Sequence, residues 1–304
     1  DPKRIRKHLD QGQVVVVAGF QGTNPAEDIA TLGRGGSDTT AVALAAALKA
    51  DRCQILKDVD GVFTANPRVV PSARKLDEIA YEEMLELASA GSEVLQSRAV
   101  EFAKNYGVVL EVLSSFEVKP GTLVREEDKQ MEQMIIRGIA ADKNQAKATL
   151  LGVPDTPGVA ARIFKALAAA NINVDMIVQN VSAAGVTDVS FTVAKDDINK
   201  TKRTIEPLVK DIKAAGLNFD GDIAKVSLVG VGMKSHSGVA YKMFDVLAAN
   251  QINIEMISTS EIKISVAIRA KDADQAVRAL HDAFGMGKPA PKKKAAKKPV
   301  AKKK

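Results

Sequence analysis

Residues 31–40 combine side chains and backbone groups that could bind an anion. Their sequence, TLGRGGSDTT, places three glycines directly before the alanine-rich run 41–50, for which we predict a helix. Ser37 and Asp38 are typical helix-capping residues, and the free N–H groups of a helix N-terminus attract a phosphate or a carboxylate. Arg34 could hold a carboxylate through two hydrogen bonds. A plain capped turn between a strand and a helix gives the same pattern, so this stretch alone leaves both interpretations open.

A second polar stretch, KDVDGVFTANPR at 57–68, follows a predicted strand at 52–58. An earlier β-branched run, 13–18, predicts a strand buried on both faces, and a helix is expected at about 37–49. Strand, loop, helix and strand form the βαβ pattern of an α/β domain, in which ligands bind at the carboxyl ends of the strands. Both polar stretches fall at such ends, which favours a binding site over a simple turn.

The other elements of the first half are predicted from their apolar periodicity. Helices are expected at 3–10, 76–90 and 92–105, a strand at 107–113, a turn-rich closing segment at 114–124 and a polar linker at 125–133. The chain begins at Asp1, inside the first of these helices. We therefore expect an N-terminal part of the natural protein to be missing.

The charge of the chain is divided unevenly. The formal net charge is +6, but the segment 288–304 carries nine lysines and no acid. The remainder has 34 basic against 37 acidic residues, so the basic character belongs to a tail and does not indicate a nucleic-acid-binding face. We expect this low-complexity tail to be disordered and solvated, and its alternative use is weak, salt-dependent attraction to nucleic acid or acidic surfaces.

Cysteine, histidine and hydropathy exclude several classes of site. The one cysteine, Cys53, cannot form an internal disulfide and predicts a buried thiol in a cytoplasmic protein. Three distant histidines lack metal-ligand spacing, so we predict no metal site. Neither a signal peptide nor a membrane-spanning run is found, and no membrane partner is expected.

A repeat with a spacing of 80 residues occupies the second half of the chain. The sequence GVAARIFKALAAANINVDMI at 158–177 matches GVAYKMFDVLAANQINIEMI at 238–257 position by position. Each copy predicts the order βαββα, the core of a ferredoxin-like module. The predicted strands are 147–153, 173–181 and 187–194, then 225–231, 253–259 and 262–268; the predicted helices are 158–170, 197–215, 238–250 and 272–284.

The turn before the first helix of each copy could bind a free amino acid. Its helix N–H groups at Asp155–Gly158 suit a carboxylate, and Asn171–Asn173 with Asp175 could bind an ammonium group. The simpler interpretation, which the residues favour slightly, is that Asp155 and Asn171 only cap helices.

The chain resembles an aspartate kinase over residues 1–285. The stretches that carry the resemblance are VVVVAGFQG at 14–22, TLGRGGSDTTAVALAAAL at 31–48, KDVDGVFTANPRVV at 57–70, MLELASAGSEVL at 84–95, PGVAARIFKALAAANINVDMIVQNVS at 157–182 and STSEIKISVAI at 258–268. Such an enzyme phosphorylates the side-chain carboxylate of L-aspartate with ATP to give 4-phospho-L-aspartate, the first step of lysine, threonine and methionine biosynthesis.

The resemblance implies an α/β fold with a definite domain order. The expected order is the C-terminal part of an amino-acid-kinase (carbamate-kinase-like) domain followed by two ferredoxin-like βαββαβ ACT modules. Its expected boundaries are 1–128 for the kinase domain, 129–146 for a linker and a strand that could complete the second module, 147–222 for the first module, 223–286 for the second, and 287–304 for the tail.

The resemblance also assigns roles at the two polar stretches. Aspartate would be held by Arg34, Gly35, Gly36 and Ser37, and Asp38 would be the catalytic residue that organises phosphoryl transfer. The ATP site would be lined by Lys57, Asp58, Phe63, Thr64 and Arg68. The phosphates of ATP would supply most of the ligands of Mg²⁺. For Arg68 the alternative is a surface salt bridge.

The chain departs from the family pattern at its start and at position 93. The family's opening lysine- and glycine-rich segment is not in this sequence, so the 304-residue stretch alone is not expected to catalyse the reaction. Glu93 stands where many members have a lysine or another non-acidic residue near the nucleotide. Because an acid facing phosphates is unfavourable, we expect Glu93 not to contact ATP.

The ACT modules resemble those of the short aspartate kinases that lysine, threonine or both inhibit. The expected effector residues lie in both modules: Asp155, Gly158, Val159, Ala160, Asn171, Ile172, Asp175, Gln179, Asn180, Ser258, Thr259, Ser260 and Glu261. A homo-oligomer through these modules is expected, and Met131 stands where some relatives start a separate regulatory subunit. The competing hypothesis is a non-catalytic amino-acid-binding regulatory protein with a degenerate kinase half.

Overall fold

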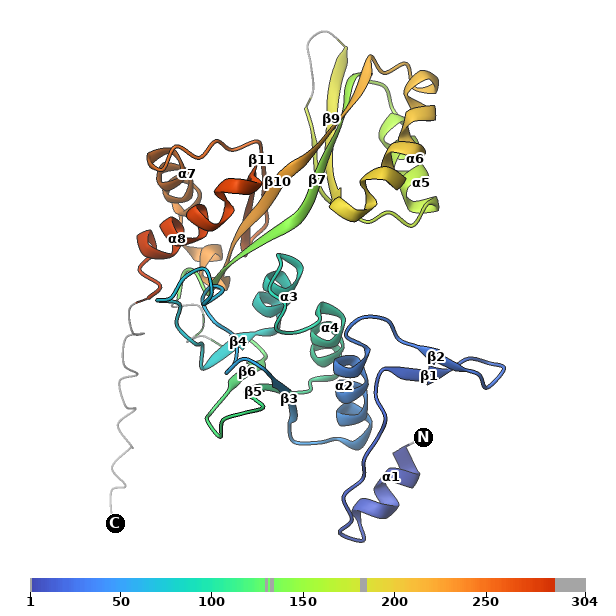
Figure 1. Cartoon of the computed structure of the whole chain (residues 1–304), viewed down its shortest axis with the longest axis vertical. Coiled ribbons are helices and arrows are strands. Elements are labelled where there is room, and N and C mark those ends of the chain that lie inside the picture. Colours follow the sequence, from blue (N-terminus) through green and yellow to red (C-terminus); the bar gives the residue numbers. More distant parts are fainter. Residues whose placement is uncertain (1, 129–130, 132–133, 181–184, 288–304) are drawn as a thin grey trace, which may run out of the picture.

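A small mixed sheet and a long antiparallel sheet form the frame of the chain (Figure 1). The computed structural model describes residues 2–128, 131, 134–180 and 185–287. The small sheet has the order β3-β5-β6-β4, in which β3 is parallel to β5 and β4 is parallel to β6. The elements of this first part are α1 (Pro2–Leu9), β1 (Gln21–Thr23), β2 (Ile29–Thr31), α2 (Gly36–Leu48), β3 (Cys53–Lys57), β4 (Glu78–Ala80), α3 (Tyr81–Ser89), α4 (Ser97–Tyr106), β5 (Leu110–Ser114) and β6 (Thr122–Arg125).

The first core forms where α2, α3 and α4 pack against the small sheet. Val42 of α2, Met84 of α3 and Val100 of α4 are each 0% exposed in the same cluster as Leu110 of β5. Cys53 is buried there as predicted, and burial raises the pKa of its thiol. The apolar faces that the sequence predicts for these helices therefore do bury against one sheet.

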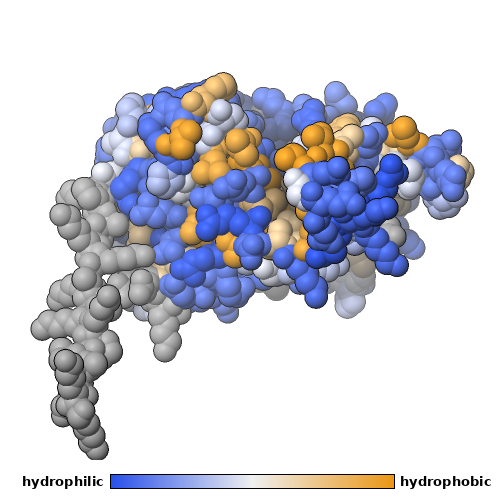
Figure 2. All heavy atoms as spheres, turned by 90° about the horizontal axis from the view of Figure 1, so that it is seen from below, coloured by the Kyte–Doolittle hydropathy of each residue, from blue (hydrophilic) through white to orange (hydrophobic). Residues whose placement is uncertain are grey.

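Three predictions for the first part are wrong. Residues 13–18 form no strand, and Val14 and Val16 are each 92% exposed. A strand needs a neighbour for its backbone groups, and β3 ends the small sheet without pairing to this run. Figure 2, which looks onto the lower end of Figure 1, shows hydrophobic groups interrupted by hydrophilic ones on this surface.

The other two corrections concern elements that tertiary pairing creates. The predicted helix 76–90 begins only at Tyr81, because Glu78–Ala80 pairs in parallel with β6. The predicted turn-rich segment 114–124 contains the start of β6, which also pairs with β5. Short strands of this kind lack a periodic signal of their own, so only their partners reveal them.

The second part is one antiparallel sheet of six strands with four helices. Its strand order is β11-β12-β10-β7-β9-β8. The elements are β7 (Gly138–Pro154), α5 (Val159–Ala169), β8 (Val174–Gln179), β9 (Val186–Ala194), α6 (Ile198–Asp211), β10 (Gly216–Val229), α7 (Val239–Ala249), β11 (Met256–Thr259), β12 (Lys263–Arg269) and α8 (Ala273–Ala283). The βαββα order predicted for each repeat is confirmed, but the predicted strands 147–153 and 225–231 each begin nine residues too late, because β7 and β10 extend into the other module.

Two long strands are shared between the repeats. The first half of β7, residues 138–142, pairs with 225–229 in the second half of β10, and residues 147–151 pair with 216–220 in its first half. A register shift between Asp220 and Lys225 separates these halves. Each module thus takes an edge of its sheet from a strand that begins or ends in the other module. In Figure 1, β7 and β10 run side by side from α7 and α8 to α5 and α6.

The core of the second module extends into the first part of the chain. Leu247 of α7 and Leu280 of α8 are each 0% exposed, and the same cluster includes Ala65 and Val70 from the polar stretch after β3. The core of the first module, around Phe191, is separate and contains only residues of that module and the ends of β7 and β10. Residues 65–73 therefore contribute to the core of the second module, whereas Val62 and Leu76 on either side belong to the first core.

A buried ion pair ties α3 to this second part. The Glu83 carboxylate accepts hydrogen bonds from Arg137 Nε at 3.1 Å, from the Val231 backbone N–H at 3.0 Å and from the Ala80 N–H at 3.2 Å. The Arg137 and Glu83 side chains are 5% and 0% exposed. A buried charge with this many donors is stable where it lies, but it cannot tolerate the loss of its partner.

We predict that Glu83→Gln strongly destabilises the protein. The substitution leaves the Arg137 guanidinium buried without a counter-charge, so the free energy of unfolding should fall by about 3 kcal/mol. Urea unfolding followed by circular dichroism measures the change. The control is Glu206→Gln in the exposed Lys202–Glu206 pair of α6, which should cost less than about 1 kcal/mol. Equal effects of both substitutions would contradict the importance of the buried pair.

Candidate functional site

The glycine-rich loop leads directly into α2, as the sequence predicts. Gly35 precedes the helix with a φ of 70°, and a Cβ there would lie 2.4 Å from the Gln96 side chain, so only glycine fits. Gly36 is the first helical residue, and Arg34 and Ser37 are exposed beside it. The loop therefore presents a cation, a hydroxyl group and the N-terminus of a 13-residue helix on one surface.

Asp38 connects this loop to the end of β3. Its carboxylate is 3.1 Å from the Nζ atom of Lys57, the last residue of the strand. Asp38 is 8% exposed, whereas the Lys57 side chain is 28% exposed. The ion pair holds the lysine at the point where the loop and the second polar stretch meet.

A cavity of about 560 Å³ lies beyond Lys57. Its lining includes Lys57, Asp58, Phe63 and Arg68, four of the five residues predicted to line a nucleotide. The predicted aspartate residues Arg34, Gly35, Gly36 and Ser37 do not line it, and their link to the cavity is the Asp38–Lys57 pair. The glycine loop follows β2 and no strand forms at 13–18, so the predicted βαβ order is not present, and the Asp38–Lys57 pair connects the two polar stretches.

Thr64 does not face this cavity. It is 0% exposed, and its Oγ1 atom accepts a hydrogen bond from the Arg74 N–H at 2.9 Å and lies 3.0 Å from His281 Nε2 in α8. The prediction that Thr64 contacts a nucleotide is corrected accordingly, because the hydroxyl is already used inside the protein. Alternation along an extended segment explains this: Phe63 and Ala65 line the cavity and Thr64 points the other way.

The second part of the chain supplies a wall of the cavity that the sequence analysis did not predict. Residues 139–143 of β7 and Asp274 and Val277 of α8 line it, and Lys143 pairs with Asp274 at 2.8 Å. These residues lie far along the chain from the polar stretch and carry no local motif. Only the pairing of β7 with β10 brings them to the site.

Charged groups of both signs surround the cavity. Arg68 is exposed and forms no ion pair with any residue that the structure describes. Glu93, expected to stay away from a nucleotide, is exposed and lines the same cavity. An anionic ligand would therefore meet both a free guanidinium and a carboxylate, and its position relative to Glu93 remains a prediction.

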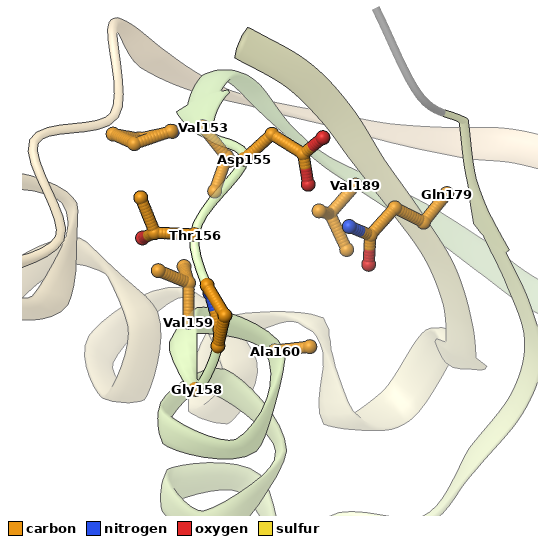
Figure 3. A pocket seen from close by; sticks show the side chains of 10 residues that line it. Val153, Asp155, Thr156, Gly158, Val159, Ala160, Gln179 and Val189 are labelled. Carbon is orange, nitrogen blue, oxygen red and sulfur yellow. The ribbon is translucent and has the colours of Figure 1, made fainter. Parts of the chain in front are cut away.

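A second cavity of about 300 Å³ opens at the N-terminus of α5. Five predicted effector residues line it, namely Asp155, Gly158, Val159, Ala160 and Gln179. Figure 3 shows the Asp155 carboxylate and the Gln179 amide facing each other across the opening, above the first turn of the helix. Gly158 precedes the helix with a φ of 94°. Carboxylate, amide and helix N–H groups thus surround one small space.

Other predicted effector residues lie elsewhere. Asn171 and Ile172 follow the C-terminal end of α5, opposite the cavity, and Ile172 is 5% exposed in the core. Asp175 forms an ion pair with Lys225, which is 3% exposed and also donates to the Ser89 carbonyl at 3.3 Å. These residues and Asp155 therefore do not line one cavity within a single chain, and the expected effector site between modules, across a subunit interface, stays a prediction.

The remaining members of the predicted set lie near the two edge strands. The Asn180 carbonyl, just after β8, accepts a hydrogen bond from the Thr187 hydroxyl. Ser258 and Thr259 end β11, while Ser260 and Glu261 form the turn to β12. β8 and β11 are the outer strands in the order of the sheet, yet Met176 of β8 and Met256 of β11 pack in one buried cluster, so the strands that carry the two groups lie close together.

The part of the chain that the structure describes holds no group of three or more His, Cys, Asp or Glu side chains suited to a metal ion. Among the same residues, no helix has the length and hydropathy needed to cross a membrane. The tail 288–304 lies outside the described residues, so the prediction of disorder is not assessed by the structure.

Family models match both parts of the chain. Residues 1–114 match the amino acid kinase family, and residues 150–207 and 226–284 match an ACT domain. The first match ends with β5, before β6 of the small sheet, and the other two matches begin within β7 and β10 and cover most of the two repeats. The expected fold class is therefore confirmed.

Individual proteins show the same likeness. The chain is 57% identical to an aspartate kinase of Stutzerimonas stutzeri over 291 residues, covering 95% of this chain and 71% of that protein. Its structure is similar to Clostridium acetobutylicum aspartate kinase, with a TM-score of 0.81 and 27% identity over 93% of this chain. It is also similar to E. coli aspartokinase III in complex with aspartate and ADP, with a TM-score of 0.78 and 32% identity over 92% of this chain. The chain spans 66% and 62% of those two solved chains.

We predict a loss of stability at acid pH that depends on His281. Burial, together with the Arg74 charge, lowers the pKa of this imidazole below its usual 6.5, and only Asp282 opposes the shift. Below pH 6.5 the unfolded state therefore binds a proton that the folded state does not, and stability falls with pH by at most about 1.4 kcal/mol per unit.

Thermal unfolding from pH 7.5 to 5.5 tests this prediction. His281→Gln should flatten the dependence below pH 6.5, whereas His8→Gln, at a half-buried histidine of α1 outside the cores, serves as the control. A wild-type profile that the His281 substitution leaves unchanged would contradict the assignment.

Proposed function

The chain belongs to the aspartate kinase family, and we propose that this protein transfers the γ-phosphoryl group of ATP to the side-chain carboxylate of L-aspartate. The products would be ADP and 4-phospho-L-aspartate. The observation that carries the proposal is the Asp38–Lys57 ion pair, which joins a helix N-terminus suited to a carboxylate to a cavity lined by Asp58, Phe63 and Arg68. Donor and acceptor subsites lie on either side of one lysine.

The chemistry asks for positioning and charge neutralisation. A carboxylate oxygen of aspartate forms a bond to the γ-phosphorus, while the bond from that phosphorus to the β–γ bridging oxygen breaks and its electron pair leaves with ADP. The acceptor is already ionised at neutral pH, so no general base is required. Both reactants are anions, which makes cations and helix N–H groups the main source of rate enhancement.

The proposed roles follow from this requirement. Arg34, Gly35, Gly36 and Ser37 hold aspartate at the start of α2, and Lys57 faces the transferred phosphoryl group. Asp38 acts at the catalytic centre by fixing the position of that lysine. Its carboxylate lies 3.1 Å from the ammonium group and accepts one of its hydrogens, so the remaining N–H groups of Lys57 point away from Asp38. Arg68, exposed at the cavity, pairs with nucleotide phosphates.

We propose that Mg²⁺ enters with ATP and is held mainly by the phosphates. The cavity offers carboxylate oxygens, that of Asp58 among them, which are the donors this ion prefers. When bound, the ion supplies positive charge to the β- and γ-phosphates. The residues of this chain then need only orient the complex against the loop before α2.

We further propose that the ACT modules regulate this activity by binding lysine, threonine or both. The similar E. coli enzyme has also been solved in complex with lysine and aspartate. In the cavity at α5, the effector carboxylate would bind the N–H groups at the start of the helix, and its ammonium group would pair with Asp155. Inhibition then requires that the effector binds one arrangement of the modules better than another.

The setting proposed for this enzyme is cytoplasmic lysine and threonine biosynthesis. A homo-oligomer assembled through the ACT modules could bring Asn171, Asp175 or Ser258 of one subunit to the cavity of another. A separate regulatory subunit that starts at Met131 is a further possibility carried by the resemblance alone. Analytical ultracentrifugation of the protein with and without lysine would decide between these assemblies.

We predict that Arg34→Ala raises the KM for aspartate. The substitution removes a two-point contact to the substrate carboxylate, and the loss of a charge-assisted hydrogen bond predicts a change of about tenfold or more. Coupled-enzyme kinetics of the protein expressed from its complete reading frame measures the effect. Arg203→Ala, on the exposed face of α6, is the matched control, and an unaltered aspartate KM in Arg34→Ala would refute the role of this arginine.

We predict that Asp155→Asn weakens effector binding. Isothermal titration calorimetry with lysine and with threonine should give a dissociation constant raised about tenfold for the amino acid that binds, because a charged partner of its ammonium group is lost. Asp211→Asn, at the exposed C-terminus of α6, should bind normally. The absence of heat with either amino acid in the wild-type protein would count against this cavity as the effector site.

A further inference from the structure

The segment that lines the nucleotide cavity is held from behind by the second ACT module. Phe63 and Ala65 line the cavity, and Thr64 between them is 0% exposed on the opposite side. The Thr64 N–H donates a hydrogen bond of 2.9 Å to the carbonyl oxygen of Arg74. The position of Phe63 and Arg68 therefore depends on how Thr64 is anchored.

Two of the anchors of Thr64 come from the regulatory part of the chain. The Thr64 carbonyl accepts the Ile139 N–H of β7 at 2.8 Å, and its Oγ1 atom lies 3.0 Å from His281 Nε2 of α8. The Arg74 N–H donates to the same oxygen, and the hydroxyl keeps a hydrogen and a second lone pair with which it can bond Nε2 in either tautomer of a neutral imidazole. Thr64 is thus fixed by one backbone bond and one side-chain bond from another domain.

A single face of α8 makes these contacts. Asp274 and Val277 line the cavity, and His281 follows at the spacing that keeps residues on one side of a helix. His281 is 0% exposed, and its Nδ1 atom has no hydrogen-bond partner within the described residues. The contact with Thr64 is therefore the side-chain hydrogen bond that this buried ring makes within the described residues.

We propose that His281 is a positioning residue for nucleotide binding, which acts through Thr64 to hold the segment Phe63–Arg68 in its binding conformation. This inference rests on the proposed function, since it names ATP as the ligand of the cavity. It assigns part of the nucleotide site to the regulatory module itself. A displacement of α8 relative to the small sheet would then alter ATP affinity before it altered the aspartate subsite at α2.

Substitutions at 281 separate positioning from general stability. His281→Leu keeps the volume and removes the hydrogen bond, and His281→Asn leaves an amide too short to reach Thr64. His281→Gln places an amide near the position of Nε2 and should restore the contact. Ser265→Ala is the matched control, because it removes another buried hydroxyl of the same module, 2.8 Å from Ser227 Oγ and not bound to Thr64.

Nucleotide affinity is measured with Mg²⁺ and a fluorescent, non-hydrolysable ATP analogue, alongside KM and kcat, on the protein expressed from its complete reading frame. We expect His281→Leu and His281→Asn to raise the analogue Kd and the KM for ATP about five- to tenfold, with the aspartate KM and kcat within twofold of wild type. His281→Gln and Ser265→Ala should bind the analogue within twofold of wild type.

Distinct outcomes would overturn the inference and the proposed function. Wild-type affinity in both the leucine and the asparagine variant, or an equal loss in Ser265→Ala, overturns the role of His281 and leaves the enzyme assignment standing. A wild-type protein that binds no analogue and shows no aspartate-dependent ADP formation overturns both. Thermal melts confirm that each variant is folded at the assay temperature, and the asparagine variant decides if the leucine variant is not.

Discussion

The relation between the two parts of the chain depends on the buried carboxylate of Glu83. It accepts hydrogen bonds from the start of its own helix, from Arg137 and from the backbone at Val231. One carboxylate therefore connects α3 to the residue before β7 and to a residue just after β10. A low-dielectric environment makes such a centre intolerant of small displacements. The orientation of the long sheet relative to the small one therefore depends on these buried hydrogen bonds and not on the length of a linker. The cavity between the two sheets keeps a defined shape as a result.

The same rigid joint explains why the nucleotide cavity has walls from both parts. With α3 joined to β7 and β10, Ala65 and Val70 belong to the same core as α7 and α8 of the second module. Lys57 and Asp38 remain on the other side, in the small sheet and its helix. Ligand binding and regulation thus share one set of contacts. One side of the segment 63–65 lines the cavity, and its other side contacts α8 of the second module.

The local motifs predicted the site better than they predicted the sheets. The glycine loop, the stretch after β3 and the 80-residue repeat each carry their signal within a few turns of chain, and Gly35, Lys57 and Gly158 lie where that signal indicates. The bond between Thr64 and His281 spans 217 residues and has no such signal. The valine run at 13–18 shows the opposite failure: its composition favours a strand, but β-structure requires a partner that β3 does not provide. Sequence reasoning therefore finds which residues could do chemistry, whereas side-chain direction and strand partners come from tertiary contacts.

The shared strands β7 and β10 have a consequence for how the chain can be divided. A cut at residue 146 or 222, where the repeats appear to separate in the sequence, would part residues 138–142 of β7 from residues 225–229 of β10 and would expose unpaired N–H and C=O groups along both segments. The first copy keeps its partner strand, because 147–151 and 216–220 both lie between these cuts, whereas the second copy loses one. The second module thus borrows a strand that precedes the first module in the chain, so it could not be inherited or expressed alone without an unpaired edge.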